Sequence, residues 1–148
     1  MSRKTLIKTY TRRDILKAGT ASAIAVNFLP ARVFGANERI TMAGIGVGGK
    51  GGSDISGAGE VGEVIALCDC DFNRGGGAAK KWPKARKFTD FREMLDKMGK
   101  DIDACTVSTP DHTHAPAAIR AMNQGIHVYC QKPLTHTVWE ARQMRLVA

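Results

Sequence analysis

The sequence has few of the features that mark metal-binding, disulfide-rich or membrane-spanning proteins. Its four cysteines, at positions 68, 70, 105 and 130, have spacings that match neither a zinc ribbon nor a Cys-x-x-Cys redox motif. We therefore expect buried free thiols that pack as small hydrophobic side chains. No internal repeat or low-complexity run is present. The apolar segment at 18–29 would extend only about 18 Å as a helix, which is too short to span a bilayer.

An excess of positive charge is also missing from most of the chain. The net charge is +8, but the first 36 residues hold seven of the 22 basic residues and only one of the 14 acidic residues. The remaining residues are therefore close to neutral. Because binding to a polyanion needs a basic surface, the sequence does not favour a nucleic-acid partner.

The basic N-terminal region has the pattern of an export signal. The segment from Thr11 to Lys17, with Arg12 and Arg13, resembles the twin-arginine signal, and the apolar segment at 18–29 follows it. Small residues at 35–36 offer a cleavage site, and no cysteine follows the apolar segment to carry a lipid. We expect a signal peptide over 1–36, recognised by the twin-arginine export machinery, and a periplasmic or extracellular protein over 37–148. An uncleaved membrane anchor is the alternative.

From residue 37 the hydrophobic pattern alternates between the periods of strands and helices. Buried strands are predicted over 39–45, 62–69, 85–88, 103–108 and 126–130. Helices are predicted over 50–58 and 72–82, from Asp90, over a stripe at 115–122 and from Thr137; the segments at 90–93 and 137–140 have capping-box spacing, and Gly125 suits a C-terminal cap. This alternation predicts the α/β class, with a doubly wound, Rossmann-type parallel sheet.

The first predicted strand runs directly into a glycine-rich turn with the spacing Gly46-x-Gly48-x-x-Gly51. Glycine at the first position permits a tight turn, at the second a close approach of backbone N–H groups to a pyrophosphate, and at the third close packing of helix against strand. The register that starts at Gly44 fits the same spacing but places the turn inside the apolar run, so we prefer the later one. The residues of this turn expected to contact a dinucleotide are Gly46, Val47, Gly48, Gly49, Lys50 and Gly51.

An acidic residue ends the second predicted strand, 18 residues after the last of these glycines. A carboxylate at this distance accepts hydrogen bonds from the adenosine ribose, so Asp69 completes the pattern of a dinucleotide site. Because a carboxylate repels a 2′-phosphate, Asp69 favours NAD, with NADP as the alternative cofactor. Arg74 is expected to stack on adenine or to pair with a 2′-phosphate, unless it is an ordinary surface residue of a helix.

Two polar clusters follow the fourth and fifth predicted strands, at 108–114 and 131–136. Because ligands of such sheets bind beyond the carboxyl ends of the strands, both clusters are expected to face the binding crevice. Asp111 and the histidines at 112, 114 and 136 offer groups that bind metals. Their spacing lacks a tight ligand pattern, so we predict no metal site.

In these motifs the chain resembles the glucose–fructose oxidoreductase/inositol dehydrogenase (Gfo/Idh/MocA) family over about residues 38–148. The resemblance rests on four motifs in the family's order: the glycine turn, Cys68-Asp69-x-Asp71-x-x-Arg74, Thr109-Pro-Asp-His-Thr-His114 and Gln131-Lys-Pro133. It implies an NAD(P)-dependent oxidoreductase that acts on a hydroxyl of a sugar, polyol or glycoside and is a homo-oligomer at full length. It also implies a C-terminal α+β domain, which this sequence does not contain.

The resemblance assigns roles to residues of the two polar clusters. It places Thr109, Pro110 and His114 beside the nicotinamide half of the cofactor, with Asp111 where the family commonly has Asn. It places Gln131 and Lys132 at the cofactor as well, and makes Lys132 the catalytic lysine between nicotinamide and the substrate hydroxyl. An ammonium group there favours a developing alkoxide. Gln131 stands where Glu is usual, so the lysine lacks a neighbouring negative charge.

Two other functions remain compatible with the sequence. One is a glycoside hydrolase or lyase that works through transient oxidation by NAD, although the retained Lys132-Pro133 argues against it. The other is a non-catalytic nucleotide-binding module. Because the family's catalytic base belongs to the C-terminal domain, we expect this chain by itself to bind nucleotide weakly and to show no turnover.

Overall fold

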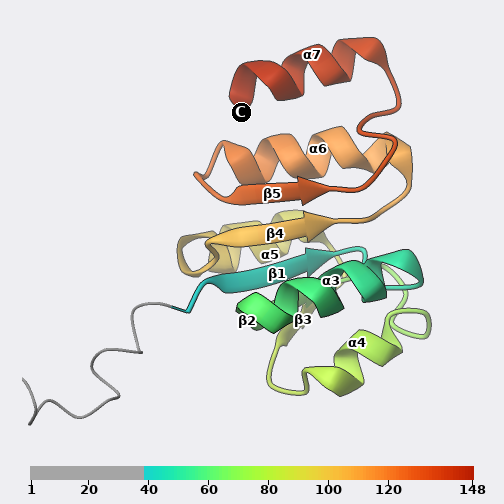
Figure 1. Cartoon of the computed structure of the whole chain (residues 1–148), viewed down its shortest axis with the longest axis vertical. Coiled ribbons are helices and arrows are strands. Elements are labelled where there is room, and N and C mark those ends of the chain that lie inside the picture. The colour runs from blue at the N-terminus through green and yellow to red at the C-terminus, as the bar shows by residue number, and fades with distance from the viewer. Residues whose placement is uncertain (1–38) are drawn as a thin grey trace, which may run out of the picture. The chain divides into compact units, whose positions relative to one another are not determined.

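The computed structural model describes residues 39–148, and the predicted signal peptide of residues 1–36 lies outside them. Strands and helices alternate along the described part of the chain. In chain order, labelled as in Figure 1, the elements are β1 (Thr41–Ile45), α3 (Lys50–Val61), β2 (Glu63–Cys68), α4 (Gly76–Lys81), β3 (Arg86–Phe88), α5 (Phe91–Met98), the 3₁₀ turn η1 (Gly99–Asp101), β4 (Ala104–Val107), α6 (Asp111–Met122), β5 (His127–Cys130) and α7 (Val138–Val147).

The five strands form one parallel sheet in the order β3-β2-β1-β4-β5. The chain first builds outward from β1 to β3 and then returns to the other side of β1 for β4 and β5. This reversal confirms the predicted doubly wound, Rossmann-type fold, and it makes the carboxyl ends of β1 and β4 the topological switch point. Ligands of open α/β sheets bind in the crevice at such a point.

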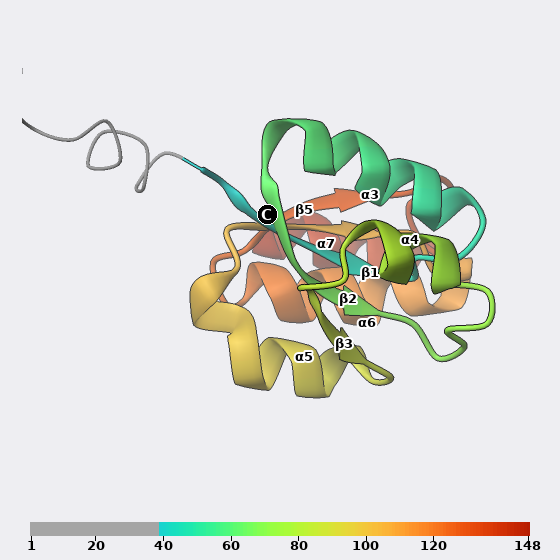
Figure 2. The same ribbon diagram turned by 90° about the horizontal axis from the view of Figure 1, so that it is seen from below.

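Helices cover both faces of the sheet (Figure 2). On one face, α3 and α4 bury a small cluster that includes Ile55, Leu67 and Ala78. On the other face, α5, α6 and α7 contribute to a larger cluster that includes Met94, Ala118 and Met144. Because both faces of the inner strands are buried, these strands are apolar runs, and this is why their sequence pattern predicted them correctly.

The second predicted helix is shorter than the sequence suggested. We expected a helix over 72–82, but α4 begins only at Gly76. The Asp71 side chain accepts a hydrogen bond from the N–H of Asn73, and its carbonyl accepts from the N–H groups of Arg74 and Gly75. An aspartate that bonds to the backbone two residues on favours a turn over a helix, and the glycines at 75–77 add little helix propensity.

Two of the three predicted helix caps are confirmed in full, although α3 extends to Val61, beyond the predicted end at 58, and α6 begins at Asp111, before the predicted stripe. Thr137 and Glu140 form the reciprocal capping box of α7, and Gly125 adopts the positive φ of a C-terminal cap after α6. Asp90 caps α5 through the N–H of Arg92, but Glu93 pairs with Lys97 instead of completing the predicted box.

Within residues 39–148, no helix combines the length and the apolar character that crossing a bilayer requires.

Candidate functional site

The glycine turn connects β1 to α3 at the switch point, as the later of the two glycine registers requires. Gly46 and Gly49 have positive φ values of 75° and 54°, which side chains rarely adopt. Gly51 is buried at the start of α3, where a Cβ atom would lie 1.9 Å from the carbonyl oxygen of Gly46. The turn therefore excludes side chains at the places where the helix comes closest to the strand.

The Asp69 carboxylate holds this turn from the end of β2. Its Oδ2 atom accepts hydrogen bonds from the N–H groups of Val47 and Gly48, at 2.9 and 3.0 Å. Its Oδ1 atom accepts from the N–H of Asp71 at 2.9 Å. A carboxylate has about four acceptor positions, so three backbone donors leave room for one more, such as a ribose hydroxyl. The structure thus gives Asp69 a role in shaping the turn that the sequence did not predict.

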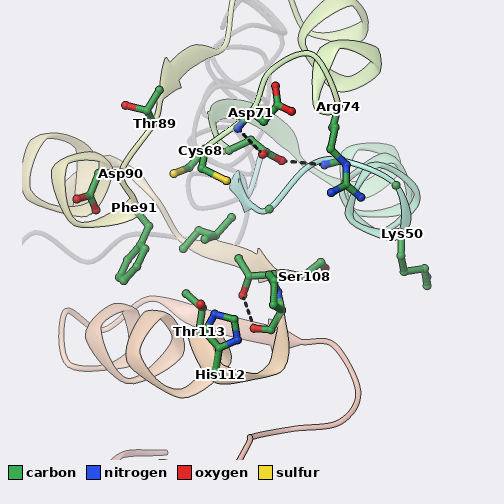
Figure 3. A pocket seen from close by; sticks show the side chains of 18 of the residues that line it. Lys50, Cys68, Asp71, Arg74, Thr89, Asp90, Phe91, Ser108, His112 and Thr113 are labelled. Carbon is green, nitrogen blue, oxygen red and sulfur yellow. Dashed lines mark hydrogen bonds between the residues drawn. The ribbon is translucent and has the colours of Figure 1, made fainter.

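A cavity of about 680 Å³ opens along the carboxyl ends of the strands, within the usual range of ligand sites. Lys50 and Arg74 lie on one side of it, with Asp90 and Phe91 across from them (Figure 3). The residues predicted as cofactor contacts that line it are Gly46, Gly48, Gly49, Lys50, Asp69, Arg74, Thr109 and Pro110. The cavity thus joins the glycine turn, the acid of β2 and the first polar cluster.

Gln131 and Lys132 lie just after β5 and do not line this cavity. Lys132 is exposed, and its backbone N–H donates a hydrogen bond to Oε1 of Gln131 at 2.7 Å. The Gln131 amide in turn donates to the Asp54 carboxylate on α3 at 2.9 Å. The predicted catalytic lysine is therefore held near α3 through its neighbour.

His114 does not line the cavity either, because its ring is buried. One ring nitrogen lies 2.7 Å from the carbonyl oxygen of Thr109, and the other lies 2.8 Å from that of Pro133. The ring therefore joins the two polar clusters, so the structure places His114 behind Thr109 as a support.

The other acid and histidines of the polar clusters meet at the surface. Nδ1 of His136 lies 3.2 Å from Oδ2 of Asp111, and this hydrogen bond lowers the pKa of the Asp111 carboxyl. His112 lines the cavity and lies beside the same carboxylate. In the part of the chain that the structure describes, no three His, Cys, Asp or Glu side chains are grouped so as to hold a metal ion.

The structure corrects the prediction that all four cysteines are buried. All four are free thiols, but only Cys68 and Cys105 are buried, whereas Cys130 is half-buried and Cys70 is exposed. Burial raises the pKa of Cys68 and of Cys105 to about 12, and that of Cys130 to about 11. Cys70 lies two residues after the buried end of β2, where the chain has left the sheet, and it lines the cavity.

This arrangement predicts one fast-reacting thiol. At pH 7.5 an alkylating reagent is expected to modify Cys70 well before the other three, because thiols with a raised pKa form little thiolate. Since Cys70 lines the cavity, saturating NAD is expected to slow its modification several-fold. Mass spectrometry of peptides over time measures both effects, and Cys70→Ser is the control that removes the fast reaction. Equal rates with and without NAD would contradict the assignment of the cavity.

Ser108, His112 and Thr113 line the cavity, as expected of the first polar cluster. Sequence reasoning missed the other lining residues, which are Ile45, Cys68, Cys70, Asp71, Thr89, Asp90, Phe91 and Arg92. A usable signal existed for Thr89 and Asp90, because they follow a predicted strand and the carboxyl ends of parallel strands meet at one edge of the sheet. No local motif marks Asp54, since its partners Ser108 and Gln131 lie far away in sequence.

Comparison with known proteins places this geometry in a family. The family model described as "Oxidoreductase family, NAD-binding Rossmann fold" (GFO_IDH_MocA) matches residues 39–148. Inositol 2-dehydrogenase of Rubrobacter xylanophilus is 30% identical over 117 residues, which cover 74% of this chain and 32% of that protein.

Solved structures agree with the family match. Myo-inositol 2-dehydrogenase of Lactobacillus plantarum is 28% identical with a TM-score of 0.66, over 74% of this chain and 32% of that one. Myo-inositol dehydrogenase of Lactobacillus casei, in complex with NAD(H) and myo-inositol, shares the fold at 24% identity and a TM-score of 0.65, over 74% of this chain and 33% of that one. The chain spans about a third of the length of these relatives.

Proposed function

This chain belongs to the Gfo/Idh/MocA family of oxidoreductases with an NAD-binding Rossmann fold, and from that membership we propose that it is the nucleotide-binding portion of an NAD(P)-dependent dehydrogenase. The substrate would be a sugar or polyol, as the names of the inositol dehydrogenases among its relatives suggest. The reaction would move a hydride between a carbinol carbon and the cofactor.

The observation that carries this proposal is the cavity at the switch point. The glycine turn lines it without side chains, and Asp69 orders the turn while keeping capacity for a further hydrogen bond. The N-terminus of α3 follows the turn, and a helix N-terminus favours an anionic group such as a pyrophosphate. These residues fit NAD, which when bound would supply the hydride acceptor.

Each polar residue has a distinct task in this proposal. Asp69 binds the adenosine ribose, and its charge selects against a 2′-phosphate. Thr109 and Pro110 border the nicotinamide half, with Thr109 supported from behind by the buried ring of His114. Lys132 stabilises negative charge on the substrate oxygen. The base that takes the hydroxyl proton would come from the C-terminal α+β domain that the family resemblance implies.

The test is an assay of the complete product of the reading frame that encodes this chain. We expect it to reduce NAD while it oxidises myo-inositol or another compound from a panel of polyols and sugars. Lys132→Met is expected to lower kcat by about 10²–10³-fold, the usual effect of removing one group that stabilises an oxyanion. Oxidation that is unaffected by this variant would contradict the role of Lys132. Release of aglycone from glycosides without net NADH would favour the hydrolase instead.

We also propose export by the twin-arginine route, which the Thr11–Lys17 motif and the apolar segment at 18–29 support. Replacing Arg12 and Arg13 together by lysine keeps the charge but removes the guanidinium groups. The double variant is therefore expected to stay in the cytoplasm. Cell fractionation with an antibody measures this, and Lys8→Arg, outside the motif, is the matched control. Continued export of the double variant would refute the proposal.

A further inference from the structure

Asp54 is a nearly buried carboxylate that lies on α3 beside the cofactor cavity without lining it. Its side chain is 5% exposed and receives hydrogen bonds from three directions. Lys50 donates from the same helix, Ser108 donates its hydroxyl from the end of β4 at 2.8 Å, and Gln131 donates its amide from the end of β5 at 2.9 Å. Burial by itself raises the pKa of Asp54, but these hydrogen bonds outweigh it, so the net shift is downward and the group is a carboxylate.

The Gln131 side chain makes a second hydrogen bond, and the two bonds together fix the orientation of its amide group. Its Nε2 donates to Asp54, and its Oε1 accepts the backbone N–H of Lys132 at 2.7 Å. Rotating the amide by 180° would bring its oxygen against the carboxylate and its N–H group against another N–H. The charge of Asp54 therefore sets the orientation of the amide, and the amide in turn fixes the backbone of Lys132.

The network connects segments that are distant in sequence but adjacent in the sheet. Asp54 and Gln131 are 77 residues apart, and the Ser108 contact places the end of the intervening strand β4 in the same network. Since α3 begins at the glycine turn, the position of Lys132 is tied to the element that would hold the pyrophosphate of NAD. Hydrogen bonds to a charged group are among the stronger ones in proteins.

We propose that Asp54 is a positioning residue for Lys132, acting through the side chain of Gln131. This inference rests on the proposed function, in which Lys132 stabilises the substrate oxygen. It makes a specific claim about residue 131: that position must carry a hydrogen-bond donor as long as residue 54 is a carboxylate. A glutamate at 131 would set two carboxylates against each other, whereas a glutamate opposite an asparagine would restore one donor and one acceptor.

The test uses Gln131→Glu alone and combined with Asp54→Asn. The first readout is the exchange rate of the Lys132 amide hydrogen, measured by NMR on the 148-residue chain. We expect exchange at least tenfold faster in Gln131→Glu and within threefold of the parent rate in the double variant. The control Gln124→Glu makes the same chemical change at an exposed site and is expected to change nothing.

The second readout is kinetic and uses the complete product of the reading frame. Gln131→Glu is expected to lower kcat at least tenfold with the KM for NAD within twofold, and the double variant is expected to recover kcat. A merely structural defect would not give this split with rescue. The exchange measurement needs no substrate, so it tests the positioning even if no oxidation is found.

Each outcome decides the proposal. Parental exchange in Gln131→Glu would overturn it, and so would failure of the double variant to restore either readout. If Gln131→Glu alone does not fold, a folded double variant supports the pairing, and an unfolded one refutes it.

Discussion

Replacing Gly51 by alanine is expected to abolish measurable NAD binding and to destabilise the domain by about 3 kcal/mol or more, the upper end of overpacking effects. The added Cβ would lie 1.9 Å from the carbonyl oxygen of Gly46 and 3.1 Å from Cβ of Ser108. The first neighbour is backbone, so it moves only if the turn itself moves. Because Gly46, Gly48 and Gly49 of that turn line the cavity, binding is lost together with packing.

A second glycine of the same helix supplies the matched control. Gly57 is exposed on α3, and a Cβ there would have nothing within 4 Å. Gly57→Ala is therefore expected to stabilise the domain by up to about 1 kcal/mol, since alanine is the better helix former. Thermal unfolding and NAD titration of both variants measure the difference. Equal unfolding midpoints and equal NAD affinities of the two variants would show that NAD binding by the turn does not require the close approach of α3 to β1.

Replacing Asp69 by alanine is expected to weaken NAD binding at least tenfold and NADP binding by less. The change removes the acceptor of three backbone N–H groups, including those of Val47 and Gly48, so the turn loosens for both cofactors. Only NAD also loses a ribose contact to the carboxylate, and a hydrogen bond to a charged group is worth about 1.5–3 kcal/mol.

Asp103 provides a control with a similar structural role at the amino ends of the strands, just before β4. Its carboxylate accepts from the backbone N–H and the hydroxyl of Thr41, and these bonds lower its pKa. Asp103→Ala is expected to lower the unfolding midpoint without changing the ratio of NAD to NADP affinity. Equal losses of both cofactors in Asp69→Ala would show that Asp69 shapes the turn but does not discriminate between them.

Local sequence pattern was sufficient for the parts of the site that are built from neighbouring residues. The strand that ends at Ile45, the glycine turn and the acid at the end of β2 follow one another in one βαβ unit, so spacing alone predicted their arrangement. The helix expected over 72–82 failed for a local reason that the sequence also contained. Asp71 competes for the backbone of a glycine-rich segment, and the prediction gave the competing turn too little weight.

Contacts between distant segments could not be predicted in this way. The pairing of Asp54 with Gln131 depends on β4 and β5 lying beside β1, which only the sheet order reveals. The pairing with Asp54 also accounts for the amide of Gln131, at a position where the family resemblance suggests glutamate. His114 is a similar case, because the sequence motif marked it as a cofactor residue, whereas the structure surrounds its ring with two backbone carbonyls.

The central claim is that the glycine turn and Asp69 form a site for NAD. The most direct measurement is an NMR titration of the ¹⁵N-labelled chain with NAD, which detects even the weak binding expected of this chain alone. We predict saturable shifts of the amide signals of Val47, Gly48 and Gly49, and their loss in Gly51→Ala but not in Gly57→Ala. Absence of shifts in this turn at millimolar NAD, or equal shifts in Gly51→Ala, would contradict the account.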